Sequence, residues 1–174
     1  MRENEHGFER AHTVGAEGYR GIQLVSDFQD LYQEMVMDHN IRPRNFRVLE
    51  DATSQAEGYN PLCGDRLTLY LQIEEDVISD IGFKGSGCAI SKASSSLMTE
   101  IVKGKSKSEA EKIFEAFHQM VTRAPGADFD DEELGDLEIL SGISEFPARV
   151  KCAILAWHTL RSALEGRQEP ATTE

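Results

Sequence analysis

Hydrophobic and polar residues alternate along residues 66–74, which predicts a half-buried β-strand. A turn at Glu75-Asp76 follows, and residues 77–84 predict a second strand that pairs with the first as an antiparallel hairpin. Residues 48–59 supply a candidate for a further strand, which would end at Asn60. The apolar face of the first strand would consist of Leu67, Leu69, Leu71 and Ile73.

Elsewhere, apolar residues recur at intervals of three and four, which predicts helices. Two of the predicted helices begin with a capping box, Ser26 with Gln29 and Ser108 with Glu111. His39 lies at the end of the first helix, and we interpret it as a capping or surface residue. The predicted helices cover residues 27–40, 89–102 and 108–122, a short segment around residues 134–140, and a final segment that begins at Phe146-Pro147.

Length and composition indicate one folded domain. With 174 residues and 40% hydrophobic content, the chain can bury one core but is short for two. Its first residues are glycine-rich and charged, without apolar periodicity, so we expect a mobile tail over residues 1–21. The domain would then span residues 22–166, and a flexible C-terminal tail would cover residues 167–174.

The charge of the chain narrows the choice of partners. Acidic residues outnumber basic residues by 31 to 18, which gives a formal net charge of −13. This charge repels phosphate backbones and anionic lipid surfaces, so we expect neither nucleic acid nor a membrane as a partner. No apolar run approaches the roughly 20 residues that span a bilayer. We therefore expect a cytoplasmic protein.

Three cysteines are the strongest chemical feature of the sequence. Their odd number, without a secretion signal, argues against a disulfide framework and for reduced thiols. Cys63, Cys88 and Cys152, together with Asp65, would supply the four ligands that tetrahedral zinc requires. The intervals between the cysteines match no compact zinc finger, and buried, unreactive cysteines are the alternative interpretation.

Residues 60–65 predict a turn with the sequence NPLCGD. Pro61 fixes the backbone as the chain enters this turn. Gly64 has no side chain that could crowd its neighbours, so Cys63 and Asp65 can converge on one point. The turn is therefore the predicted centre of the chemistry.

A second glycine-rich segment reads GSGCAIS at residues 85–91. It lacks the strand and helix context of a phosphate-binding loop, and its glycines would instead let the backbone pass close to a metal. Cys88 would begin a helix, whose dipole favours a thiolate. On the final helix, His158 follows Cys152 by six positions and points away from it, so we expect no histidine ligand from this helix.

Three segments, in this order, resemble the SufU branch of the IscU/NifU-like scaffold family. They are NPLCGD at residues 60–65, GSGCAIS at residues 85–91 and VKCAILAW at residues 150–157. The resemblance covers about residues 31–164. Lys151 stands where IscU-like scaffolds carry a histidine, and the long segment 104–142 is also typical of the SufU branch. The resemblance implies an α+β fold, with a small antiparallel sheet packed against several helices.

The resemblance also implies that the three cysteines and Asp65 hold zinc, and that Cys63 accepts sulfur. In SufU-like proteins, a pyridoxal-phosphate cysteine desulfurase, SufS, passes persulfide sulfur to such a partner. The sulfur then moves to the downstream Suf machinery for iron–sulfur cluster assembly. Arg149 and Lys151 would offset the negative charge of the thiolates.

Three functions are open at this point. In the first, the chain is a zinc-dependent sulfurtransferase and thus an enzyme. In the second, it is a scaffold that binds a nascent iron–sulfur cluster on the same cysteines. In the third, it is a structural zinc domain without sulfur transfer. Zinc is the cofactor in the first and third cases, and a cluster is bound in the second. We favour the first.

Overall fold

Helices and a small sheet follow one another along the chain, and a computed structural model describes them over residues 16–130 and 132–173. The described part matches the predicted α+β class. The elements are α1 (Ala16–Ile41), β1 (Ser54–Asn60), β2 (Asp65–Glu74), β3 (Val77–Ser86), α2 (Ala89–Val102), α3 (Lys107–Thr122), the 3-10 helix η1 (Gly135–Glu145), α4 (Pro147–Glu165) and β4 (Ala171–Thr172).

The sheet has four strands in the order β3-β2-β1-β4. The predicted hairpin is confirmed, because β2 and β3 pair antiparallel across the turn at Glu75 and Asp76. The candidate strand within residues 48–59 is also present, as β1, and it pairs antiparallel with β2. The fourth strand, β4, runs parallel to β1 at the edge of the sheet.

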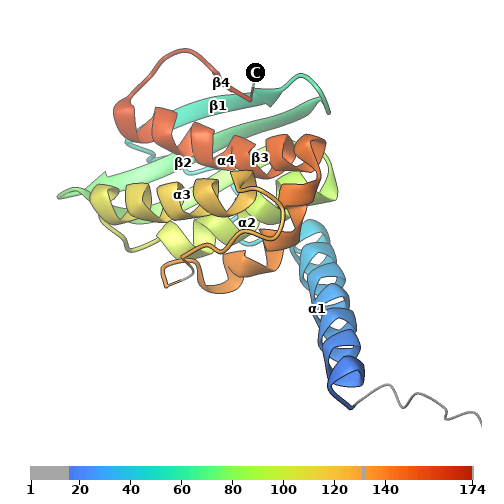
Figure 1. Ribbon diagram of the computed structural model, residues 1–174. Coiled ribbons are helices and arrows are strands. Elements are labelled where there is room, and N and C mark those ends of the chain that lie inside the picture. Colours follow the sequence, from blue (N-terminus) through green and yellow to red (C-terminus); the bar gives the residue numbers. More distant parts are fainter. Residues whose placement is uncertain (1–15, 131, 174) are drawn as a thin grey trace, which may run out of the picture.

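The helices lie on one face of the sheet. Figure 1 shows α2, α3 and α4 gathered on this face, while the N-terminal end of α1 projects away from them. Burial alternates along β2, where the apolar residues predicted for one face, Leu67, Leu69 and Leu71, are buried. This alternation follows from the two-residue period of a strand whose one face packs against helices.

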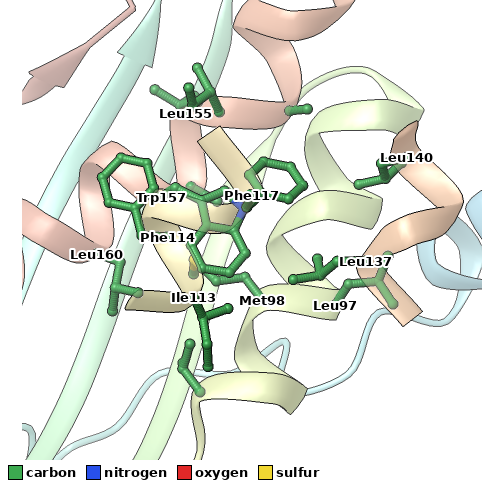
Figure 2. Packing of buried hydrophobic residues seen from close by; sticks show 14 of the residues in the cluster. Leu97, Met98, Ile113, Phe114, Phe117, Leu137, Leu140, Leu155, Trp157 and Leu160 are labelled. Atoms are coloured by element: carbon green, nitrogen blue, oxygen red, sulfur yellow. The ribbon is translucent and has the colours of Figure 1, made fainter. Parts of the chain in front are cut away.

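Stacked aromatic rings form the centre of the core between α3 and α4. The ring of Trp157 stacks on Phe117 at a centroid distance of 4.8 Å and on Phe114 at 6.0 Å. Figure 2 shows these rings together, with Leu97 of α2 and Leu137 of η1 beside them. Burial of each such ring contributes about 1.5–3 kcal/mol, so this cluster is a main source of stability.

Helix α1 begins at Ala16 and not at residue 27 as we predicted. Gly18 and Gly21, which belong to the expected tail, lie within this helix, where a glycine costs about 1 kcal/mol relative to alanine. Residues 1–15 of the expected tail lie outside the described residues. His39 corrects a second expectation, because it is buried and its Nδ1 lies 2.7 Å from the hydroxyl oxygen of Ser96 in α2.

One further prediction is wrong in detail. The capping box of α3 consists of Ser106 and Glu109, not Ser108 and Glu111. The reason is that Ser106 forms a bridge with Val77 and keeps an extended backbone, so the helix begins directly after it.

Residues 167–174, which we expected to be a flexible tail, include β4. A strand of two residues has no period that a sequence pattern could reveal. Its Ala171 is buried and pairs with Gly58 of β1. Among the described residues, no helix is long and apolar enough to cross a membrane.

Candidate metal centre

The predicted turn connects β1 to β2 at one end of the sheet. Asn60 is the last residue of β1 and Asp65 the first of β2, and the two face each other in the antiparallel register. The N–H of Gly64 donates to the carbonyl of Asn60 at 2.8 Å, which closes the turn. Gly64 has a φ of +73°, so glycine is required here for its backbone conformation rather than for the lack of crowding that we had inferred.

The turn brings a thiol and a carboxylate to the start of α4. Ligand atoms of Cys63, Asp65 and Cys152 all lie within 4.8 Å of one another. The sulfur atoms of Cys63 and Cys152 are 3.2 Å apart, and both thiols are free. Asp65 and Cys152 are buried, whereas Cys63 is exposed. Among the described residues, no histidine belongs to this cluster.

Cys88 lies beside the cluster but outside its 4.8 Å limit. Its thiol caps α2, since the sulfur accepts the N–H of Ser91 at 3.4 Å. Its own N–H donates to Oδ1 of Asp65 at 2.9 Å. Cys88, like Cys63, is exposed.

Gly87 shows why glycine precedes Cys88. A Cβ atom at this position would lie 2.5 Å from Oδ1 of Asp65, which is closer than atoms can approach. The backbone therefore passes directly over the carboxylate of Asp65, while its predicted close approach to a metal stays a prediction. This close approach also lets the N–H of Cys88 reach Asp65.

Asn60 is a component of the site that we did not single out from the sequence. It is fully buried, and its amide nitrogen donates to Oδ2 of Asp65 at 3.0 Å and to the sulfur of Cys152 at 3.6 Å. Its place as the first residue of NPLCGD was the available signal. We had read the motif only for groups that bind metal directly.

Burial, followed by hydrogen bonds with Cys63 and Cys88, raises the pKa of the Cys152 thiol well above its usual range. Without a metal, Cys152 therefore stays protonated at neutral pH. A metal ion that binds its sulfur has to displace this proton. Metal affinity at this site consequently increases with pH.

The two basic residues that we predicted to support the thiolates lie on the first turns of α4. Arg149 is exposed, and its guanidinium carbon lies 4.4 Å from the centre of the Phe146 ring. Lys151 is half-buried. Burial raises the pKa of nearby Tyr32, an effect that Arg149 opposes and that Cys88 strengthens. The effect of Arg149 and Lys151 on the thiolates stays a prediction.

The donor set suits zinc. Two sulfur atoms and one carboxylate converge, and a third sulfur, that of Cys88, lies beside them. A buried carboxylate is costly unless it is compensated, and a cation at this point would add positive charge beside Asp65. Zinc accepts thiolate and carboxylate ligands together in four-coordinate sites. The cluster can thus hold a metal, with Cys63, Asp65, Cys88 and Cys152 as the predicted ligands.

Comparison with known proteins places this arrangement in a family. Residues 31–153 match the model of the NifU-like N-terminal domain. The chain belongs to this family. The match contains Cys63, Asp65, Cys88 and Cys152, which are the predicted ligands.

Relatives within this NifU-like family carry two kinds of name. The chain is 41% identical over 144 residues to the zinc-dependent sulfurtransferase SufU of Bacillus subtilis (strain 168), which covers 82% of this chain and 95% of the relative. It is also 42% identical over 141 residues to the iron–sulfur cluster assembly scaffold protein IscU of Streptococcus pyogenes serotype M1, which covers 81% and 87%.

The fold of the NifU-like family is confirmed by solved structures. One neighbour is described as an iron–sulfur cluster assembly scaffold of the SUF system from Fervidobacterium islandicum AW-1, with 38% identity and a TM-score of 0.70 over 75% of this chain and 94% of that one. A NifU-like protein (N-terminal) from Brucella abortus is 21% identical, with a TM-score of 0.71, and supports the fold alone. The resemblance to the SufU branch is therefore confirmed.

Proposed function

We propose that this protein is a zinc-dependent sulfurtransferase, which accepts persulfide sulfur from a pyridoxal-phosphate cysteine desulfurase of the SufS type. The observation that carries the proposal is the pairing of an exposed thiol, Cys63, with a buried thiol and carboxylate, Cys152 and Asp65. The buried groups would hold a metal, and the exposed group can meet a partner. The sulfur would then serve iron–sulfur cluster assembly in the cytoplasm.

Cys63 is the proposed acceptor because of its place in the turn. Exposure alone does not select it, since Cys88 is also exposed. The sulfur of Cys88, however, accepts the N–H of Ser91 at the start of α2, and its movement would uncap the helix. Cys63 lies next to Gly64 in a short turn, where it can move without loss of a cap.

The transfer step conserves electrons. The Cys63 thiolate attacks the terminal sulfur of the partner's persulfide, a new S–S bond forms on Cys63, and the S–S bond on the partner breaks. The partner's cysteine leaves as a thiolate and takes up a proton. Bound zinc would supply deprotonated cysteine at neutral pH. Asp65 and Cys152 would keep their places during this step because both are buried.

The surroundings of Cys63 support a protein partner. Leu62 precedes it and is 57% exposed, and Phe146 at the start of α4 is 46% exposed. A groove beside the start of α4, the helix that carries Cys152, is lined by Phe28, Tyr32 and Phe146, among other residues. Exposed apolar side chains around a reactive group are typical of surfaces that bind another protein.

Scaffolding of a nascent iron–sulfur cluster is the second candidate, and the similarity to a protein named as an IscU scaffold favours it. The same cysteines would hold the cluster. Metal content separates the two functions, because a cluster-loaded protein is brown and a zinc-loaded protein is colourless. About one zinc per chain in a colourless protein would support the zinc-dependent sulfurtransferase over the cluster scaffold. It would also be consistent with a purely structural zinc site, which the sulfur-acceptance test separates.

Sulfur acceptance is tested by brief incubation with a SufS-type desulfurase and cysteine, followed by peptide mass spectrometry. We expect one added sulfur on Cys63 and faster desulfurase turnover in the presence of the protein. Cys63→Ser should lose both effects, whereas Ser86→Ala, an exposed residue near the site, should keep them. Sulfur that appears first on Cys88 or Cys152, with Cys63 unmodified, would contradict the assignment. Turnover that does not respond would leave the structural zinc domain as the better account.

A further inference from the structure

The C-terminal segment reaches the candidate metal centre through a single hydroxyl group. Oγ1 of Thr173 donates to Oδ1 of Asn60 at 3.1 Å. The same amide, through its nitrogen, donates to Asp65 and Cys152. Two of the predicted metal ligands are therefore connected to the end of the described chain through one buried side chain.

Local structure explains how Thr173 arrives there. Helix α4 ends at Gly166, whose φ of +66° lets the chain reverse direction, and the N–H of Arg167 donates back to the carbonyl of Ser162. The chain then runs alongside β1, where Ala171 pairs with Gly58 and Thr172 with Tyr59. The next residue in this parallel register, Thr173, falls beside Asn60.

Asn60 uses its whole hydrogen-bonding capacity. Its oxygen accepts from Thr173 and, at 3.2 Å, from the N–H of Leu62, while its nitrogen donates to Asp65 and Cys152. An asparagine amide offers two donor and two acceptor positions, and all four are filled. The amide is completely buried, so water cannot replace a lost partner. Each bond therefore fixes the orientation of the amide that faces the ligands.

We propose that Asn60 and Thr173 form a clasp, defined as these two residues and their hydrogen bond, that positions Asp65 and Cys152 for metal binding. Both are positioning residues, since neither contributes a metal ligand. The proposal rests on the proposed function only in taking the bound metal to be zinc. Partners that orient metal ligands typically change affinity 10- to 100-fold when they are removed.

The test compares the rate of zinc release to a chromophoric chelator between the wild type and three variants. Thr173→Val has nearly the same shape but no hydroxyl, and we expect release to be about 2- to 10-fold faster, the effect of one lost hydrogen bond. Thr173→Ser keeps the hydroxyl and loses the methyl group, and we expect it to release zinc at the wild-type rate. If Thr173 acted only through packing of its methyl group, this variant would release zinc faster. Gln168→Ala is the matched control, because Gln168 lies in the same segment and its side chain donates to the carbonyl of Gly166 rather than to Asn60.

A second measurement does not depend on metal. In zinc-free protein, amide hydrogen exchange at Leu62 should be faster in Thr173→Val than in the wild type, because Leu62 donates to the amide that Thr173 fixes. Unchanged zinc release together with unchanged Leu62 exchange in folded Thr173→Val would overturn the clasp. If the wild type binds no zinc, the exchange measurement alone decides.

The outcome is separate from that of the proposed function. A protein in which Thr173→Val accelerates zinc release, but in which Cys63 never carries sulfur, has a clasp and no sulfurtransferase activity. A protein in which Cys63 carries sulfur, but in which Thr173→Val changes neither zinc release nor Leu62 exchange, has sulfurtransferase activity and no clasp. Asn60→Ala should reduce zinc affinity about 10- to 100-fold, with the folded state of this variant checked by circular dichroism.

Discussion

Helix α4 contributes to two regions that are built on different principles. Trp157 belongs to the aromatic core, where it stacks on Phe114 and Phe117. Five positions earlier, Cys152 belongs to the metal centre, where it contacts Cys63 and Asn60. The core depends on buried apolar area, which is non-directional, whereas the metal centre depends on hydrogen bonds and ligand geometry.

This difference indicates that stability and chemistry can be changed separately. A residue in the core can be replaced at a cost in unfolding free energy while the ligands keep their places on the same helix. A ligand can be replaced at a cost in metal binding while the rings stay stacked. Variants of each region therefore measure how far α4 transmits a change from one region to the other.

The largest expected effect comes from the core. Trp157→Ala should lower the free energy of unfolding by about 3–5 kcal/mol, since it removes the largest buried ring and leaves a cavity. Urea denaturation of the zinc-free protein measures this change. Phe28→Ala, which removes a ring that is 42% exposed, is the control and should cost far less. A loss below about 1 kcal/mol for Trp157→Ala would mean that the core does not dominate stability.

Metal removal should have a smaller effect. Zinc that binds only the folded state stabilises it by about 2.7 kcal/mol when free zinc is about 100 times its Kd. For a chain of this size, chelation should therefore lower Tm by about 5–11 °C. Scanning calorimetry before and after verified zinc removal gives the shift. Cys152→Ser should show little shift on chelation, and an unchanged wild-type Tm would count against any stabilising metal.

The smallest effect concerns the contact between α1 and α2, outside both regions. Burial and the neighbouring Arg44 lower the pKa of His39, although Glu100 opposes this. The unfolded state then binds a proton more readily, so the unfolding free energy should fall as the pH drops below about 6.5, until the folded-state pKa is reached.

Replacement of His39 isolates this contribution. The difference between the wild type and His39→Asn, both zinc-free, should depend on pH between about 5 and 7, as measured by denaturation at each pH. His158, whose pKa burial also lowers, is present in both proteins and cancels in this comparison. A difference that does not vary with pH would show that His39 keeps the same charge in the folded and unfolded states.

The strands and most helices were predictable because their patterns are local. Alternation over residues 66–74 and the turn at Glu75-Asp76 were enough to predict β2, β3 and their pairing. The start of α1 was not predictable from periodicity, since its glycines resemble a tail. The burial of His39 and the pairing of β4 depend on contacts with residues far away in the sequence, Ser96 and Gly58.

The convergence of Cys63, Asp65 and Cys152 was predictable from the sequence, but the residues that support them were not. Cys63 and Asp65 share a turn, and Cys152 joins them as expected, although the role of all four predicted ligands stays a prediction. Asn60 was missed because, although it shares the NPLCGD motif with Asp65, its importance also depends on Cys152 and Thr173, which lie far away in the sequence. The division into tails and one domain also stays a prediction.

The parallel pairing of β4 with β1 has a consequence for the order in which the protein is made. Asn60 and Thr173 are separated by 113 positions. At about 5–20 residues per second, the ribosome adds Thr173 about 6–23 s after Asn60. During this time Cys63 and Asp65 exist without β4, and until α4 is made they also lack Cys152. A nascent chain can therefore assemble its hairpin early, while the complete metal centre, with its contact to β4, forms only after Thr173 has been added.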